Sequence, residues 1–226
     1  MENNMRYNKQ LNMLSHAKTR RHEEKVLKRY VLLILCATLL AGCFGGGSKS
    51  THYYLVDPVE QNPIRSVQEG ETPLAVEIID LHLPQYLERF QIVTRNRENQ
   101  LHLSDANQWG EALRKNLLRT MGTNLAGLLS TIDVGTPLNR SASLPDYRVH
   151  IHIIRFEQDS DGRVKLDARW QLGDDSDDQA VMYAVSLQSS SIAEGDYADI
   201  VAAMQDLYSQ FGLRIAESIV AKEEAQ

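Results

Sequence analysis

The sequence has very little cysteine. Its 226 residues include only Cys36 and Cys43, and both lie near the N-terminus. The rest of the chain therefore has no thiol for a disulfide, a metal site or a nucleophile. A chain of this length can bury a core without covalent cross-links. We expect one globular domain over residues 52–222 and a short polar tail at residues 223–226.

Motifs of common enzymes and cofactor sites are also missing. No serine lies in a Gly-x-Ser-x-Gly elbow, and no glycine-rich phosphate loop is present. The acidic runs near residues 159–161 and 174–178 lack the pattern of a calcium loop. The sequence therefore predicts no catalytic residues, no metal and no cofactor. An envelope hydrolase that uses Asp174, Asp175, Asp177 and Asp178 is a less favoured alternative.

The N-terminal region lacks an apolar run long enough to cross a membrane as a helix. The run Tyr30–Leu40 has eleven residues, whereas a span needs about 20. Lys25, Lys28 and Arg29 precede it, which is typical of a secretion signal. The signal ends in Leu40-Ala41-Gly42-Cys43, the pattern at which a lipoprotein signal is cleaved.

These residues predict three segments. Residues 1–42 are a signal peptide, whose translation could start at Met1, Met5 or Met13. Cleavage between Gly42 and Cys43 makes Cys43 the first mature residue, and its thiol carries a covalent diacylglycerol lipid. Residues 43–51 form a flexible glycine-rich tether. Phe44 follows the lipidated cysteine, where aspartate commonly retains a lipoprotein in the inner membrane, so Phe44 permits export to the outer membrane.

The mature chain would be poor in positive charge. Residues 1–42 hold eight of the 24 Lys and Arg and three of the 30 Asp and Glu, which leaves 16 basic and 27 acidic groups and a net charge of about −11. Nucleic acids and broad anionic surfaces recruit clusters of Lys and Arg. This balance argues against nucleic acid as a partner, and it leaves the lipid on Cys43 as the membrane contact.

Alternating apolar and polar residues predict several strands. We expect strands at residues 52–56 and 74–82, a helical turn at 85–90, and a hairpin formed by 91–95 and 100–103. A three-stranded meander is expected at residues 147–156, 164–172 and 181–187, with a tight turn at Asp161-Gly162.

Two apolar stripes predict long helices. The first helix is expected to be capped by Ser104 or Asp105 and to run through Trp109 to Leu128, and the second to run from Asp196 to Lys222. The predicted fold is a single-domain α+β structure. Its sheet is largely antiparallel, with mixed pairing left open, and both helices cover one face. A carrier that holds a lipid between sheet and helices is an alternative suggested by the same stripes.

Three features suggest either a partner surface or core packing. Tyr53 and Tyr54 are adjacent on a predicted strand, so one of them must point away from the core. The other two features are the segment Leu83-Pro84-Gln85-Tyr86-Leu87 and Trp109. The candidate partner surface consists of Tyr53, Tyr54, Leu83, Pro84, Tyr86 and Trp109. His150 and His152 share a strand face, but two histidines do not make a metal site.

Several motifs together resemble one family. They are Tyr53-Tyr54-x-Leu, Leu83-Pro84-x-Tyr86-Leu87 followed by Ile92-Val93-x-Arg95, Trp109, and the series Arg155-Phe156, Asp161-Gly162 and Trp170. With the lipoprotein signal, their order resembles the PqiC/YmbA family of ABC-type transport auxiliary lipoproteins. The sequence departs from the family at Gly110-Glu111-Ala112, where members often carry a small residue and a proline.

The resemblance implies a function that the motifs alone do not establish. It implies an outer-membrane lipoprotein that faces the periplasm and is not an enzyme. Its partner would be an MCE-domain tunnel protein, which it would dock at the outer membrane so that lipids cross the periplasm and membrane integrity is supported. A homo-oligomeric ring would suit such an adaptor.

Overall fold

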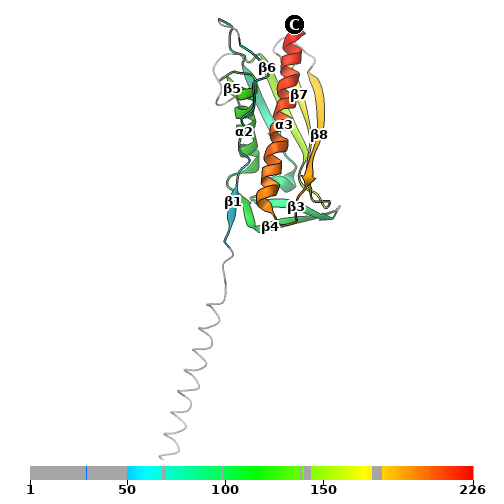
Figure 1. Ribbon diagram of the computed structural model, residues 1–226. Coiled ribbons are helices and arrows are strands. Elements are labelled where there is room, and N and C mark those ends of the chain that lie inside the picture. The colour runs from blue at the N-terminus through cyan, green and yellow to red at the C-terminus, as the bar shows by residue number, and fades with distance from the viewer. Residues whose placement is uncertain are drawn as a thin grey trace, which may run out of the picture. The chain divides into compact units, whose positions relative to one another are not determined.

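Within residues 50–225, eight strands form one mixed, open sheet and two long helices cover one of its faces (Figure 1). This computed structural model describes Arg29 and residues 50–225, except positions 68, 69, 98, 138, 140–143 and 175–179. Ser50–Gln226 forms a compact unit. The elements are β1 (His52–Tyr54), β2 (Val76–His82), the 3-10 turn η2 (Gln85–Leu87), β3 (Gln91–Arg97), β4 (Gln100–Trp109), α2 (Leu113–Leu128), β5 (Val134–Gly135), β6 (Tyr147–Gln158), β7 (Arg163–Asp174), β8 (Val181–Ser191) and α3 (Tyr197–Glu224).

The predicted meander is confirmed. β6 pairs antiparallel with β7, and β7 pairs antiparallel with β8. Ile151, Trp170 and Tyr183 follow one another across the three strands and face the helices. The turn between β6 and β7 uses Gly162, whose φ of 79° lies in the left-handed region that favours glycine. Alternation in the sequence was strong here because one face packs on the helices and the other faces water.

Parallel pairs make the sheet mixed. β2 lies parallel to β6 and to β5, and β1 lies parallel to β4. Between β2 and β6 the chain forms the β3–β4 hairpin and α2, so the two strands are joined by the long crossover that parallel pairing requires. The α+β prediction is confirmed, with the mixed pairing that the sequence had left open.

The predicted start of the first helix is wrong. Ser104 and Asp105 do not cap a helix, because β4 continues through them to Trp109, and α2 begins at Leu113. Gln108 pairs with Gln91, and Trp109 pairs with Tyr54. These pairings on both sides of β4 override a local spacing that also fits a helix. The predicted turn at residues 85–90 is present only over Gln85–Leu87, as η2, and residues 88–90 form a bend. Asp196 caps α3 by accepting a hydrogen bond from the Asp199 amide at 3.2 Å.

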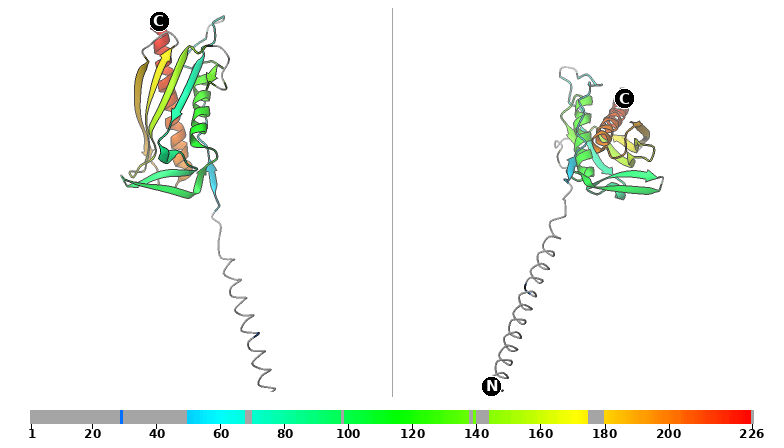
Figure 2. Two further views of the ribbon diagram at one scale, coloured as in Figure 1. Left: turned by 180° about the vertical axis from the view of Figure 1, so that it is seen from behind. Right: turned by 60° about the horizontal axis from the view of Figure 1, so that its bottom comes forward.

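The core lies between the sheet and the two helices, as views from behind and from below show (Figure 2). Tyr208 of α3 is fully buried, and its hydroxyl donates to the Leu117 carbonyl of α2 at 2.9 Å. The indole nitrogen of Trp170 donates to Ser218 at 3.0 Å, which fixes α3 on β7. The apolar stripes of both helices thus pack in the core. Of the helices that the structure describes, none combines the length and the apolar character needed to span a bilayer.

Candidate functional site at the tether end

The structure brings the six residues of the candidate partner surface to one end of the domain. We call this end the tether end and define it as residues 52–55, 83–90 and 108–114. Tyr54 pairs with Trp109, and the Gly110 amide donates to the Tyr54 carbonyl at 2.8 Å. The Trp109 amide donates to the Phe90 carbonyl at 2.7 Å. Backbone hydrogen bonds therefore join three segments that are far apart in the sequence.

The six side chains differ in exposure. Leu83 and Trp109 are buried, at 2% and 3% exposure, so both belong to the core. Tyr54 is half-buried, and its hydroxyl donates to Asn107 at 3.2 Å. Tyr53 is 67% exposed and points away from the core. Pro84 and Tyr86 are half-buried in the connection between β2 and β3.

Phe90 is a surface residue that the sequence analysis missed. It was placed in the predicted helical turn, whereas the structure puts it in the bend after η2 with 60% exposure. A hollow of about 230 Å³ beside it is lined by Glu88, Arg89, Phe90, Ala112, Leu113 and Arg114. The Nε of Arg114 lies 3.5 Å from a Glu88 oxygen. Phe90 lies between two polar residues and belongs to no periodic apolar pattern, so the sequence did not identify it as a surface residue.

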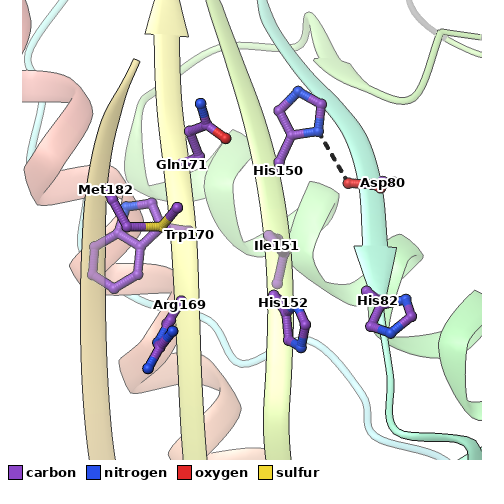
Figure 3. Close-up of a pocket in the computed structure, with 9 residues that line it drawn as sticks. All are labelled: Asp80, His82, His150, Ile151, His152, Arg169, Trp170, Gln171 and Met182. Carbon is purple, nitrogen blue, oxygen red and sulfur yellow. Dashed lines mark hydrogen bonds and ion pairs between the residues drawn. The ribbon is translucent and has the colours of Figure 1, made fainter. Parts of the chain in front are cut away.

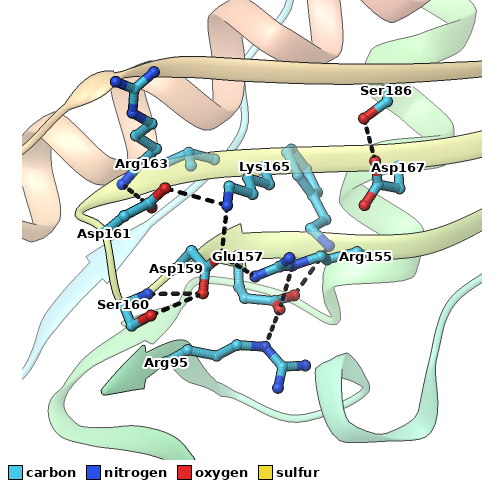
Figure 4. A network of polar contacts seen from close by, with 12 residues as sticks. Arg95, Arg155, Glu157, Asp159, Ser160, Asp161, Arg163, Lys165, Asp167 and Ser186 are labelled. Atoms are coloured by element: carbon cyan, nitrogen blue, oxygen red, sulfur yellow. Dashed lines mark hydrogen bonds and ion pairs between the residues drawn. The ribbon is translucent and has the colours of Figure 1, made fainter. Parts of the chain in front are cut away.

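The buried carboxylate of Glu157 holds the tether end to the sheet, and Figure 4 shows the polar network around it. Glu157 is fully buried, and one of its oxygens accepts hydrogen bonds from Arg95 Nε at 2.7 Å and Arg155 Nε at 3.1 Å. The other accepts from the Tyr86 hydroxyl at 2.8 Å and the Phe156 amide at 3.1 Å. Such complete pairing makes a buried charge tolerable.

Tyr86 and Asp159 in this network each keep one protonation state near neutral pH. Burial raises the pKa of Tyr86, and the nearby Glu157 carboxylate raises it further, so the hydroxyl keeps its proton. Burial alone would raise the pKa of Asp159, but hydrogen bonds from Lys165, the Ser160 amide and Arg155 hold it well below its ordinary value. Lys165 Nζ lies 2.6 Å from Asp159. Neither Tyr86 nor Asp159 is poised to exchange protons near neutral pH.

A second hollow lies on the face of the sheet opposite the helices (Figure 3). It has a volume of about 280 Å³, and its lining residues include Asp80, His82, His150, His152 and Arg169. His150 Nδ1 lies 3.2 Å from Asp80, and the rings of His82 and His152 are 4.8 Å apart. His82 escaped the sequence analysis because only the parallel register of β2 with β6 places it beside His152. In the part of the chain that the structure describes, no three His, Cys, Asp or Glu side chains are grouped to hold a metal ion.

Some predicted residues lie outside the described part of the chain. These are Gly42, Cys43 and, in the acidic turn, Asp175, Asp177 and Asp178. Asp174, the first residue of that turn, is the last residue of β7.

Comparisons with solved structures support the fold. One crystal structure of an uncharacterized protein superposes with a TM-score of 0.57 at 20% identity, covering 75% of this chain and 99% of the other. A Xanthomonas campestris protein assigned to DUF330 superposes with a TM-score of 0.53 at 16% identity, covering 79% of this chain and 98% of the other. At these identities the likeness extends to the fold alone.

Comparisons of sequence identify the family. Among curated proteins, none matches the chain. Residues 54–216, which hold nearly all of the described domain, match the family described as ABC-type transport auxiliary lipoprotein component. The sequence resemblance to this family is thereby confirmed. The chain belongs to the family of ABC-type transport auxiliary lipoprotein components.

Proposed function

We propose that this protein is a non-enzymatic subunit of an MCE-type lipid transport system, anchored to the outer membrane by lipid on Cys43. The observation that carries the proposal is the family match over residues 54–216. A predicted lipoprotein signal that ends in Gly42-Cys43 lies upstream of it and supports the anchor. A transport auxiliary lipoprotein needs an anchor and a surface for its partner, and it needs no catalytic site.

The polar clusters of the described residues favour a binding role over catalysis. The buried Glu157 has hydrogen-bond donors on both oxygens, and the raised pKa of Tyr86 keeps that hydroxyl protonated. A general base would need a free lone pair that faces a substrate. The network instead fixes the connection between β2 and β3 to the sheet.

The run of α3 from one end of the domain to the other supports a docking role. α3 begins near the tether end and finishes at the opposite end of the domain (Figures 1 and 2). A lipid anchor ahead of β1 holds the first end near the membrane and leaves the other free to reach into the periplasm. The partner would be the tunnel protein of the same transport system. A ring of several copies remains a prediction from the family resemblance.

Co-purification from the native host tests the proposed partner. The chain, with an affinity tag after Gln226, is extracted from membranes in mild detergent, and bound proteins are identified by mass spectrometry. Cys43→Ser is the matched control, because it removes the lipid-bearing thiol and leaves the described domain intact. An MCE-domain protein should be recovered with the parent chain and strongly reduced with Cys43→Ser. Recovery of no MCE-domain protein with a correctly lipidated parent chain would contradict the proposed partner.

A further inference from the structure

The tether end carries two aromatic side chains that the fold leaves in water. Tyr53 is 67% exposed and Phe90 is 60% exposed. Both flank β4, since Tyr53 pairs with Gln108 and the Phe90 carbonyl accepts from the Trp109 amide. Because neighbouring strands lie about 4.8 Å apart, the Cα atoms of Tyr53 and Phe90 are separated by roughly 10 Å. Trp109 is buried, pairs with Tyr54 next to Tyr53 and donates to the Phe90 carbonyl, so the backbone at both aromatic residues is held to the core.

Basic groups lie beside Phe90. Arg89 precedes it, and Arg114 lines the same hollow. Within the described residues, the Arg89 guanidinium makes no ion pair, while Arg114 faces Glu88 at 3.5 Å. Arginine can lay its apolar stem along a hydrophobic surface and extend its charge to a polar layer. Aromatic rings with nearby arginines suit the boundary between lipid headgroups and acyl chains.

The length of the tether limits which end can meet the membrane. Nine peptide steps separate Cys43 from His52, and they span at most about 32 Å when fully extended. α3 has 28 residues, which gives it a length of about 42 Å. A domain tethered at β1 therefore cannot stand on its opposite end, whereas the tether end is always within reach of the bilayer.

We propose that the tether end rests on the lipid surface, with Tyr53 and Phe90 in the headgroup region and Arg89 and Arg114 facing lipid phosphates. The inference rests on the proposed lipid anchor at Cys43. The acidic mature chain cannot be held to the bilayer by its overall charge, so apolar burial of the two aromatics carries the contact. The contact orients the domain, so that the far end of α3 points away from the membrane.

The opposite end supplies a matched control. Ile132 follows the C-terminal end of α2 and is 97% exposed, so apolar exposure alone does not choose between the two ends. α2 has 16 residues, which places Ile132 about 24 Å or more from the start of that helix. Because the tether is short and precedes β1, we expect Phe90 to meet lipid and Ile132 not to.

Tryptophan fluorescence in vesicles tests the inference. The lipidated chain is purified from membranes and reconstituted into vesicles of phosphatidylethanolamine and phosphatidylglycerol, with or without brominated acyl chains. Phe90→Trp, Tyr53→Trp and Ile132→Trp are each compared with the parent chain, whose own Trp109 and Trp170 are buried. The added emission of Phe90→Trp and Tyr53→Trp should shift to shorter wavelength and be quenched by bromine. The added emission of Ile132→Trp should be unaffected.

The mass of the N-terminal peptide is measured on the same sample, so that failure of the proposed orientation can be distinguished from failure of the proposed anchor. Unquenched Phe90→Trp and Tyr53→Trp in a chain whose Cys43 carries lipid would overturn the orientation and leave the anchor standing. Equal quenching at residues 90 and 132 would also overturn it. A chain without lipid on Cys43 would refute the proposed anchor and, with it, the tether argument. Because both aromatic positions are exposed, Tyr53→Trp keeps the test decisive if Phe90→Trp fails to fold.

Discussion

The hydroxyl of Tyr86 donates a 2.8 Å hydrogen bond to the carboxylate of Glu157, 71 residues further along the chain. This bond joins the connection between β2 and β3 to the C-terminal end of β6. Exposure divides residues of the tether end into two groups. Tyr86, Leu83 and Trp109 hold the tether end in shape, whereas Tyr53 and Phe90 are presented outside it.

Removing the Tyr86 hydroxyl should destabilise the domain. Tyr86→Phe leaves one oxygen of the buried Glu157 without its side-chain donor, and a hydrogen bond to a charged group contributes about 2 kcal/mol. Urea unfolding should show a loss of that size. Tyr53→Phe is the control, because its hydroxyl lies on an exposed side chain. Equal stability of the two variants would show that the bond to Glu157 contributes nothing.

Truncation of Trp109 and truncation of Tyr53 should have very different effects on stability. Trp109→Ala removes a buried side chain of the core and should cost about 3 to 5 kcal/mol of unfolding free energy. Tyr53→Ala should change stability by less than about 0.5 kcal/mol and alter only contacts outside the domain. Chemical denaturation checks both. A large loss of stability in Tyr53→Ala would mean that Tyr53 belongs to the core.

Asp159 should make stability depend on pH in the acid range. Its pKa is lower in the folded state than its ordinary value of 3.8, so the unfolded chain takes up a proton first as the pH falls. The stabilising contribution is complete above the unfolded pKa and is lost as the pH falls through the folded pKa. Urea midpoints of the parent and Asp159→Asn should differ most at pH 6, begin to approach each other as the pH falls below about 3.8, and meet only below the folded-state pKa.

A control for that titration is Glu217→Gln, which removes a carboxylate from an exposed ion pair with Arg214 on α3. Exposed pairs contribute little, so its midpoint should follow that of the parent at every pH. A difference between the parent and Asp159→Asn that stays constant from pH 6 to pH 3 would contradict the proposed role of the Asp159 carboxylate.

Two glycines should respond to alanine in opposite ways. Gly162 has a φ of 79°, and a Cβ there would lie 2.6 Å from Ser191 Oγ and 2.9 Å from the Ile192 carbonyl oxygen. Gly162→Ala should therefore cost about 1 to 3 kcal/mol. Gly127 lies inside α2 with nothing within 4 Å of an added Cβ, so Gly127→Ala should gain up to about 1 kcal/mol. Thermal unfolding of both variants checks the signs, and a stabilised Gly162→Ala would refute the strained turn.

The sequence predicted the elements whose pattern is local. Val149, Ile151 and Ile153 alternate along β6, and the stripe from Ile200 to Ile219 repeats along α3, because each faces a single apolar layer. The first half of β4 was predicted as a strand at residues 100–103, but its second half, residues 104–109, was predicted as helix because Trp109 and Leu113 have a helical spacing. In the structure Trp109 pairs within the sheet and Leu113 begins α2. Whether residues 104–109 form a strand or a helix depends on their pairing with Tyr54 and Gln91. Both are distant in the sequence, so a local pattern does not show this pairing.

The surface residues were harder to predict for the same reason. Tyr53 could be identified because adjacent residues on a strand face opposite sides. Phe90 and His82 could not be, because their neighbours are set by the β3–β4 pairing and by the parallel register of β2 with β6. Trp109 looked like a candidate surface residue because an aromatic side chain suits an interface and a core equally well.

The proposed function requires that lipid on Cys43 anchors this transport subunit to the outer membrane. To test this, the inner and outer membranes of the native host are separated, and the mass of the N-terminal peptide of the chain is measured in each fraction. We expect a peptide that begins at Cys43, carries a diacylglycerol thioether and lies in the outer-membrane fraction. A peptide that begins elsewhere, or an unmodified Cys43 in a soluble chain, would contradict it.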